Sequence, residues 1–163
     1  MICKKCVLDN SIKSLSFNNY GVCSFCEKYF DLIESLKKNL DKKNIEEKFK
    51  KISLINKKYN CLIGVSGGVD SSFVVHLAAK YNLRPLLLHF DNGWNSELAV
   101  SNIKKLASKC NFDLSTYVVN WQEFKDLQRS FILSGVVDIE LVTDHAIFAN
   151  LINTAKKLGI KHI

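Results

Sequence analysis

A short apolar stretch of this chain ends abruptly in a glycine turn, and a helix-forming segment follows at once. Residues 61–65 are apolar, the turn is Ser66-Gly67-Gly68, and residues 71–81 have helical periodicity. A strand, a glycine turn and a Ser/Asp-rich helix start together present backbone N–H groups that suit a phosphate. This order of strand, turn and helix predicts a nucleotide-binding loop. The alternative interpretation is an ordinary strand-to-helix turn in which a Ser or Asp caps the helix.

The rest of the chain alternates between strand-like and helix-like segments. We predict further strands at 85–90 and 114–119 and the start of a fourth at 161–163, with helices at 97–110, 121–133 and 143–158. The first helix, 71–81, is expected to present Phe73, Val74, Leu77 and Ala78 on one face. Alternation of this kind predicts an α/β fold with a doubly wound parallel sheet. Since the sequence stops three residues into a strand, we expect it to be the N-terminal part of a longer protein and the sheet to be incomplete at its C-terminal end.

Four of the six cysteines form two closely spaced pairs near the N-terminus. The pairs are Cys3-x-x-Cys6 and Cys23-x-x-Cys26, 16 residues apart, and a turn is expected at 18–21 between them. This spacing is typical of a zinc knuckle in which four thiolates fill a structural site. The alternative is a redox pair, which the duplicated spacing disfavours. Cys61 and Cys110 have no spaced partners and are expected to be small buried hydrophobes.

Three parts are therefore expected along the chain. These are a cysteine-rich knuckle at 1–26, a connector at 27–60 made of two amphipathic helices broken near 41–44, and a partial nucleotide-binding domain at 61–163.

The charge and composition exclude some functions. The net charge is +7, but the basic residues are nearly all lysine, and the only arginines are Arg84 and Arg129. Arginine is the better partner for phosphates and base edges, so nucleic-acid binding is not expected. No apolar run reaches the ~18 residues that span a bilayer, and cysteines and lysines occupy the N-terminal positions where a signal peptide would have its apolar stretch. We expect a cytoplasmic location without membrane attachment.

The turn at residues 66–68 differs from two common nucleotide-binding motifs. It lacks the lysine of the Walker motif and does not follow the G-x-G-x-x-G pattern. Its glycines let a ligand approach the backbone, and Asp70 is suited to orient the loop or hold Mg²⁺. Asp91, at the end of the second predicted strand, is placed at the edge where open α/β sheets bind ligands, although an Asp-Asn-Gly turn would look the same. The expected nucleotide-binding residues are Val65, Ser66, Gly67, Gly68, Asp70, Ser71, Ser72 and Asp91.

Residues 66–72 resemble the SGGxDS signature of the PP-loop ATP pyrophosphatases. With residues 91–97, residues 143–149 and the double CxxC, the whole chain resembles the N-acetyl sugar amidotransferases of bacterial surface-polysaccharide synthesis. The resemblance implies that ATP is cleaved to AMP and pyrophosphate, and that a sugar acetamido group becomes an acetamidino group. It also implies ammonia from a separate glutaminase subunit and an N-acetylated sugar or nucleotide sugar as acceptor.

Within this resemblance, the polar residues after the strands take expected roles. Asn92 and Asn95 are candidates for contacts to sugar hydroxyls, and Trp94 can stack on a sugar face or simply cover the core. Asp144 can bind substrate or metal and His145 can accept a proton from ammonia, although both also fit a plain capped helix start at Thr143. The candidate catalytic residues are Asp70, Asp91, Asp144 and His145. His76 and His89 are expected to pack.

Two other functions fit the same motifs. A PP-loop enzyme that thiolates tRNA or modifies a related nucleoside would also combine this loop with cysteine-bound metal, but neither Cys61 nor Cys110 is well placed for sulfur transfer. A non-catalytic module that binds ATP and zinc belongs to a different class. Release of AMP and pyrophosphate in response to an N-acetylated sugar and ammonia would separate these hypotheses.

Overall fold

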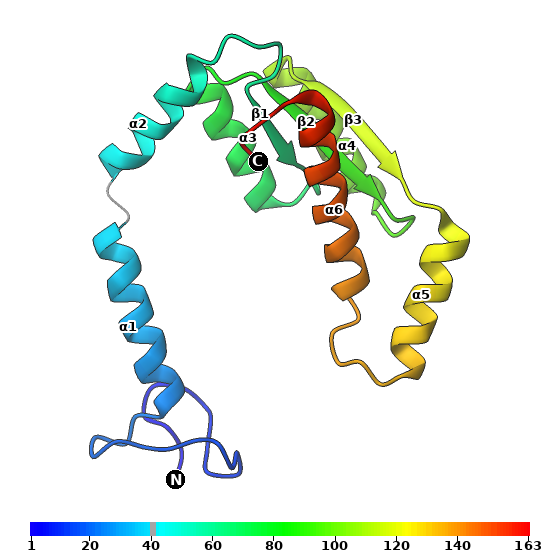
Figure 1. The fold of residues 1–163 in the computed structure, drawn as a ribbon. Helices are drawn as coiled ribbons and strands as arrows, with labels where there is room; N and C mark the ends of the chain where they lie inside the picture. The colour runs from blue at the N-terminus through cyan, green and yellow to red at the C-terminus, as the bar shows by residue number, and fades with distance from the viewer. Residues whose placement is uncertain (40–41) are drawn as a thin grey trace. The chain divides into compact units, whose positions relative to one another are not determined.

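The computed structural model describes residues 1–39 and 42–163, and contacts divide these residues into two units (Figure 1). The first unit is Met1–Glu47 and the second is Lys48–Ile163. This boundary falls inside the segment expected to be a connector. The three-part division at residues 26 and 60 stays a prediction.

The first unit consists of a cysteine-bearing segment followed by α1 (Ser24–Asn39). Isolated antiparallel bridges join Ile2 to Asp9 and Phe17 to Cys23. The expected turn forms, because the Asn18 side chain accepts hydrogen bonds from the N–H groups of Tyr20 and Val22, and Gly21 has a φ of +74°. The expected break near 41–44 is wrong for residues 42–44, since α2 (Lys42–Ser53) already begins at Lys42; residue 41 lies outside the described residues.

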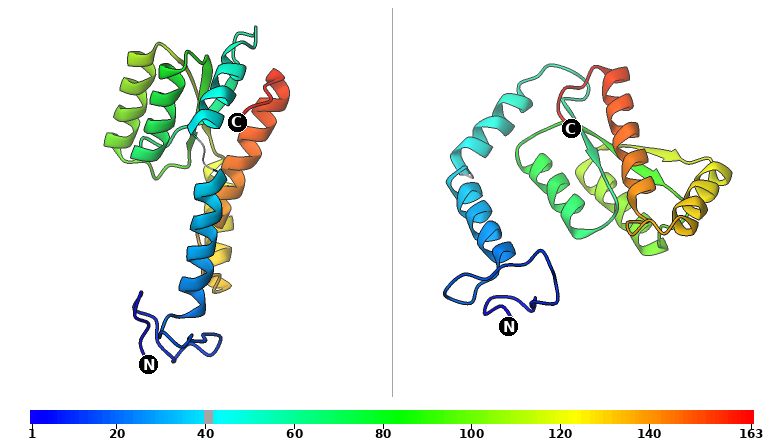
Figure 2. Two further views of the ribbon diagram at one scale, coloured as in Figure 1. Left: turned by 90° about the vertical axis from the view of Figure 1, so that its left-hand side faces the viewer. Right: turned by 60° about the horizontal axis from the view of Figure 1, so that its bottom comes forward.

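A parallel sheet forms the centre of the second unit. Its strands are β1 (Cys61–Gly64), β2 (Pro85–Asp91) and β3 (Asp113–Val118), and β2 lies in the middle. Helices α3 (Val69–Lys80) and α4 (Glu97–Cys110) lie on one face, and α6 (Leu141–Leu158) lies on the other (Figures 1 and 2). Helix α5 (Trp121–Leu133) begins shortly after β3 ends. The predicted α/β class and parallel sheet are confirmed.

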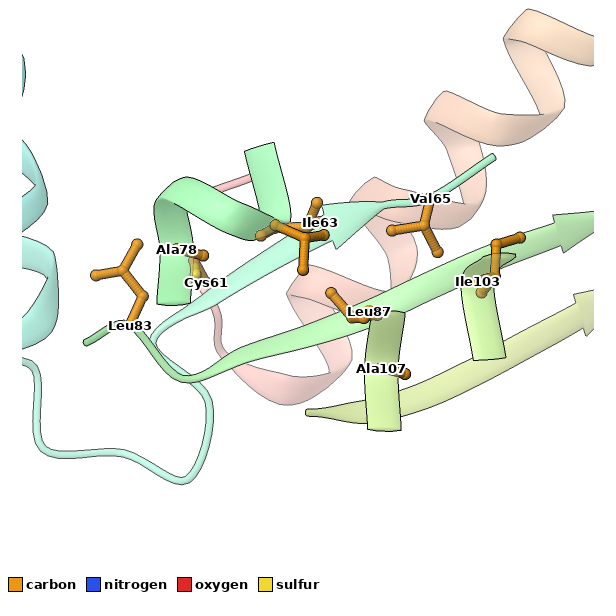
Figure 3. Close-up of a cluster of buried hydrophobic side chains, with 9 residues drawn as sticks. Cys61, Ile63, Val65, Ala78, Leu83, Leu87, Ile103 and Ala107 are labelled. Atoms are coloured by element: carbon orange, nitrogen blue, oxygen red, sulfur yellow. The ribbon is translucent and has the colours of Figure 1, made fainter. Parts of the chain in front are cut away.

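The alternation of side chains along β1 and β2 builds two separate cores. Cys61, Ile63 and Leu87 face α3 and α4 and pack with Ile103 and Ala107 (Figure 3). Leu62, Leu86 and Leu88 point to the opposite face, where they pack with Leu151 and Ala155 of α6. Strands buried on both faces read as continuous apolar runs, which explains why these two were recognisable from sequence.

One local expectation is wrong in part, since Ala78 is buried as expected but its predicted neighbours Phe73 and Val74 are not, and a second expectation is wrong. The buried residues of α3 are Val75 and Ala78, whereas Phe73 and Val74 are largely exposed. Apolar residues surround much of this helix, so periodicity could not select the inward face. Residues 161–163 do not form a strand, although the N–H of Leu62 donates to the carbonyl of His162 over 2.9 Å and so ties this segment to β1.

None of the helices in the described part of the chain is both long enough and apolar enough to cross a membrane.

Candidate nucleotide site and cysteine cluster

The turn between β1 and α3 is held by its own hydroxyl groups. The Ser66 and Ser71 hydroxyls lie 3.3 Å apart, and the Ser72 hydroxyl donates to the carbonyl of Gly68 over 2.7 Å. Gly68 is the N-cap of α3, and no side chain caps the helix. The first N–H groups of a helix have no partner inside it, so they remain available to an anionic ligand.

Helix α4 fixes the position of Gly67. Gly67 has a φ of +78°, and a Cβ built on it would lie 2.4 Å from the carbonyl oxygen of Ala99. The Asn102 side chain also donates to the carbonyl of Gly67 over 3.4 Å. Only glycine satisfies both the backbone angle and this close approach.

A cavity of about 430 Å³ lies beside this turn, at the carboxyl ends of β1 and β2. One wall comes from α6 through Thr143, Ile147, Asn150 and Leu151, and we call this space the loop cavity. The Thr143 hydroxyl is buried and has no hydrogen-bond partner within the described chain. A buried hydroxyl without a partner is costly, which makes Thr143 a candidate ligand contact. The remaining lining residues are Gly64, Val65, Ser66, Leu88, Phe90, Asn92 and Asn95.

The Asp91 carboxylate shapes the loop that follows β2. Its Oδ1 accepts hydrogen bonds from the Gly93 N–H over 2.9 Å and from the Asn95 side chain over 3.1 Å. This is the turn role that the sequence left open, and Asp91 does not line the loop cavity. Asn92 and Asn95 do line that cavity, beside the turn at Ser66. Their expected contact to sugar hydroxyls stays a prediction.

Trp94 is not brought to the loop cavity. Its ring is 53% exposed and makes edge contacts with Trp121 and Phe124, with centroids 6.4 and 5.9 Å apart. A substrate contact by Trp94 therefore stays a prediction.

Asp144 lies in the first turn of α6, near the helix start as expected, but α6 begins at Leu141 and its N-cap is Glu140. The expected capping by Thr143 and Asp144 is wrong. Asp144 is exposed and lines neither the loop cavity nor the larger cavity beside it. His145 lines that larger cavity, whose volume is about 720 Å³.

Sequence reasoning missed Thr143, Phe90 and Asn150 as lining residues. A signal exists for α6, because Thr143, Ile147 and Asn150 are spaced by four and three residues and so share one helix face. Two polar residues on an otherwise apolar stripe indicate a ligand-facing wall. His89, which was expected to pack, is indeed buried, and its Nδ1 lies 3.1 Å from the carbonyl oxygen of Val65, next to the turn.

The four N-terminal cysteines converge in the first unit. Their sulfur atoms all lie within 4.8 Å of one another, with Cys6 and Cys23 at 3.7 Å and Cys3 and Cys26 at 4.0 Å. A tetrahedral zinc site with bonds of about 2.3 Å places its sulfurs about 3.8 Å apart. The cysteine cluster therefore has the donor set and the spacing of a metal site.

Backbone groups favour ionisation at one end of the cluster. Burial opposes the charged form of Cys3, but hydrogen bonds from the N–H groups of Lys5 and Cys23 outweigh it and lower the pKa to about 6. The Cys6 thiol beside Cys26, together with burial, raises the pKa of Cys26 to about 12. Closely packed thiols resist joint ionisation, and a bound cation would remove that penalty.

The comparisons with known proteins support the fold. An NMN synthetase from Francisella tularensis superposes on 74% of the chain with a TM-score of 0.53 and 17% identity, and the match covers 52% of that protein. An NH3-dependent NAD synthetase from Campylobacter jejuni superposes on 74% of the chain with a TM-score of 0.50 and 17% identity, covering 55% of that protein. These likenesses agree with the doubly wound α/β fold predicted from the sequence.

The sequence comparisons are less informative. An uncharacterized protein from Methanocaldococcus jannaschii is 26% identical over 165 residues, which cover all of this chain and 57% of the relative. No protein-family model matches the chain. The chain thus spans a little over half the length of the proteins that it matches.

Proposed function

We propose that the protein is an ATP-dependent amidotransferase that converts a sugar N-acetyl group to an acetamidino group. The observation that carries this proposal is the uncapped start of α3 beside the loop cavity, with Gly67 held in its conformation by α4. An anion-binding helix start next to a cavity at the carboxyl edge of a parallel sheet suits a nucleotide. The ammonia dependence named for one structural neighbour supports ammonia as the nucleophile.

The reaction proceeds in two balanced steps. The amide carbonyl oxygen attacks the α-phosphorus of ATP, the bond from that phosphorus to the bridging oxygen breaks, and pyrophosphate leaves. Ammonia then attacks the activated carbon, the C–O bond breaks to release AMP, and nitrogen loses a proton. The protein needs no nucleophilic side chain for this route, since its tasks are to position the reactants and stabilise phosphate charge.

We assign these tasks to residues of the turn, of the loop after β2 and of α6. The backbone from Ser66 to Ser72 holds the pyrophosphate part of ATP, with the Ser66 and Ser71 hydroxyls beside it. Asp70, in the first turn of α3, would hold Mg²⁺, which supplies positive charge to the phosphates, while Asp91 keeps the following loop in place. His145, which lines the larger cavity, takes the proton from nitrogen as a general base. A partner glutaminase supplies the ammonia.

The cysteine cluster is proposed to hold zinc in a structural role. Cys3, Cys6, Cys23 and Cys26 would supply all four ligands, which leaves no open position for catalysis.

Sulfur transfer is a weaker hypothesis. Cys61 is buried in the core between β1 and α3, and burial raises the pKa of its thiol to about 11. A protonated, enclosed thiol is a poor nucleophile.

The direct test measures AMP and pyrophosphate release from ATP with ammonium and an N-acetylated nucleotide sugar. We expect release to depend on both the sugar and ammonium and to yield one amidine per AMP. Release that requires tRNA and a sulfur donor instead would establish the nucleoside-modifying alternative. ATP binding without release under any of these conditions would indicate the non-catalytic module.

Replacing Thr143 with valine should separate ligand binding from stability. Valine has nearly the same shape, and it removes a buried hydroxyl that has no partner in the described part of the chain. We expect the free energy of unfolding to stay the same or rise by up to about 1 kcal/mol, and the affinity for α,β-methylene ATP to fall about fivefold. Urea unfolding and calorimetric titration measure the two effects. A destabilised variant with unchanged affinity would show that the hydroxyl is structural.

A further inference from the structure

His89 is a polar side chain within an apolar strand. In β2 it follows Leu86, Leu87 and Leu88, and it is buried, with 5% of its surface exposed. Its Nδ1 lies 3.1 Å from the carbonyl oxygen of Val65, and its Nε2 has no hydrogen-bond partner in the described part of the chain. A buried polar atom without a partner lowers stability. Core packing alone therefore favours an apolar side chain at this position, and the contact with Val65 indicates a different role.

This contact holds one peptide unit at the entrance to the turn. A carbonyl oxygen only accepts hydrogen bonds, so Nδ1 of His89 carries the proton and donates it to the Val65 carbonyl. That carbonyl belongs to the same planar trans peptide as the Ser66 N–H, and the two groups of such a peptide point in opposite directions. The Ser66 N–H is thereby directed to the other side of the chain, where it donates to the Ser71 hydroxyl over 3.3 Å.

The side to which the Ser66 N–H points is the side suited to a phosphate. The Ser66 and Ser71 hydroxyls lie there 3.3 Å apart, and the uncapped start of α3 follows directly. The Ser66 N–H thus joins the N–H groups of this helix start as a donor to an anion. If the peptide turned over, it would present a carbonyl oxygen instead, whose partial negative charge repels phosphate. The orientation of this one peptide therefore decides whether the entrance to the turn attracts or repels the ligand.

We propose that His89 is a positioning residue for the nucleotide, which holds the peptide between Val65 and Ser66 so that its N–H, and not its carbonyl oxygen, faces the phosphates of ATP. His89 itself touches no ligand and acts through this peptide. The inference rests on the proposed function, because it requires the phosphates of ATP at the turn. It assigns a determinant of nucleotide binding to β2, outside the sequence of the turn.

Three substitutions of His89 separate the hydrogen-bond donor from the shape of the ring. His89→Asn keeps a donor nitrogen bonded to Cγ, as Nδ1 is, whereas His89→Gln carries the same amide one carbon further from the backbone. His89→Leu is apolar and has no donor. In calorimetric titration of the 163-residue chain with α,β-methylene ATP, we expect His89→Leu and His89→Gln to bind about tenfold more weakly than the parent chain. His89→Asn should bind within about twofold of the parent chain.

Leu83→Ala is the matched control for stability. Leu83 is buried in the same core as Val65, at the end of the sheet away from the turn (Figure 3). Its truncation leaves a cavity and should lower the urea midpoint of unfolding more than His89→Leu does, because the introduced leucine side chain fills most of the space of the imidazole. Leu83→Ala should nevertheless keep the nucleotide affinity of the parent chain. A loss of affinity that exceeds the loss of stability is therefore expected only at His89.

NMR reports the orientation of the peptide directly. Long-range correlation spectra of the imidazole nitrogens distinguish the two tautomers, and we expect the proton of His89 on Nδ1 in the chain without ligand. When α,β-methylene ATP is added, the Ser66 amide proton should move downfield, as a donor to a charged oxygen does. We expect this movement in the parent chain and in His89→Asn, but not in His89→Leu.

Three results would overturn the role of His89. They are parent-like nucleotide affinity in His89→Leu, equal affinities in His89→Asn and His89→Gln, and a proton on Nε2 in the chain without ligand. A loss of affinity in Leu83→Ala as large as that in His89→Leu would also overturn it, because the stability of the sheet would then control binding. In all these cases the nucleotide site stands. Failure of the unsubstituted chain to bind α,β-methylene ATP would instead refute the proposed function, and the role of His89 with it.

Discussion

Gly67→Ala is expected to abolish release of AMP and pyrophosphate and to lower the free energy of unfolding of the second unit by about 3 kcal/mol. A left-handed backbone costs alanine about 1–2 kcal/mol, and the added Cβ collides with the Ala99 carbonyl oxygen at 2.4 Å. Relief of that collision moves the turn away from α4. Loss of two backbone hydrogen bonds to phosphate, at about 1.5 kcal/mol each, would weaken binding of α,β-methylene ATP about a hundredfold.

Gly135→Ala is the matched control for Gly67→Ala. Gly135 has a φ of +67°, and a Cβ built there meets no atom within 4 Å. It therefore carries the cost of the backbone angle without the collision, so we expect a loss of about 1 kcal/mol and unchanged nucleotide affinity. Chemical unfolding and calorimetric titration of both variants separate the two effects. Equal nucleotide affinities in Gly67→Ala and the parent chain would show that this turn does not hold the phosphates.

The fold was predictable where burial leaves a simple trace in the sequence. β1 and β2 are buried on both faces and read as continuous apolar runs. Helix α6 ends at the predicted residue 158, because Gly159 adopts a φ of +63° that suits a helix C-cap. The inward face of α3 was not predictable, because Val74 and Val75 are equally apolar and only packing against the sheet selects one of them. The segment 161–163 is too short for its sequence to specify a strand. In the structure, a backbone hydrogen bond from the Leu62 N–H to the His162 carbonyl joins it to β1.

The candidate site, like the fold, could be predicted from the sequence only in part. The turn at Ser66–Gly68 can be recognised from the sequence, because its conformation depends on glycines and hydroxyl side chains that are adjacent in the chain. The α6 wall leaves a weaker trace, because the spacing of Thr143 and Asn150 places them on one helix face but does not indicate which part of the chain they meet. Only the fold brings α6 beside the turn. Asp91 illustrates the remaining ambiguity, because a carboxylate that shapes an Asp-Asn-Gly turn and one that binds a ligand have the same sequence.

The cysteine cluster was predictable from spacing alone, but its role depends on what the first unit can bury. Cys3 and Cys23 are enclosed, whereas large apolar side chains around them, such as Ile2, Val7 and Tyr20, are exposed. A segment with so small a core gains little stability from the burial of apolar side chains, so it depends on a cross-link such as a bound metal or a disulfide. The sulfur spacing suits zinc, whose binding to such sites supplies about 10–16 kcal/mol at neutral pH.

We therefore expect one zinc ion per chain, and expect Cys23→Ser to remove it and to unfold residues 1–23. Zinc content by mass spectrometry and amide signals by NMR measure the two effects. Cys110→Ser should keep the metal, because Cys110 lies in α4, outside the cysteine cluster. Cys6→His keeps four ligands, and histidine replaces cysteine in many zinc sites. This variant should therefore keep both the zinc ion and the fold that Cys23→Ser loses. If the four thiols form disulfides instead, a reductant would unfold this segment and a chelator would not, which would show that the pairs are redox-active rather than metal-binding.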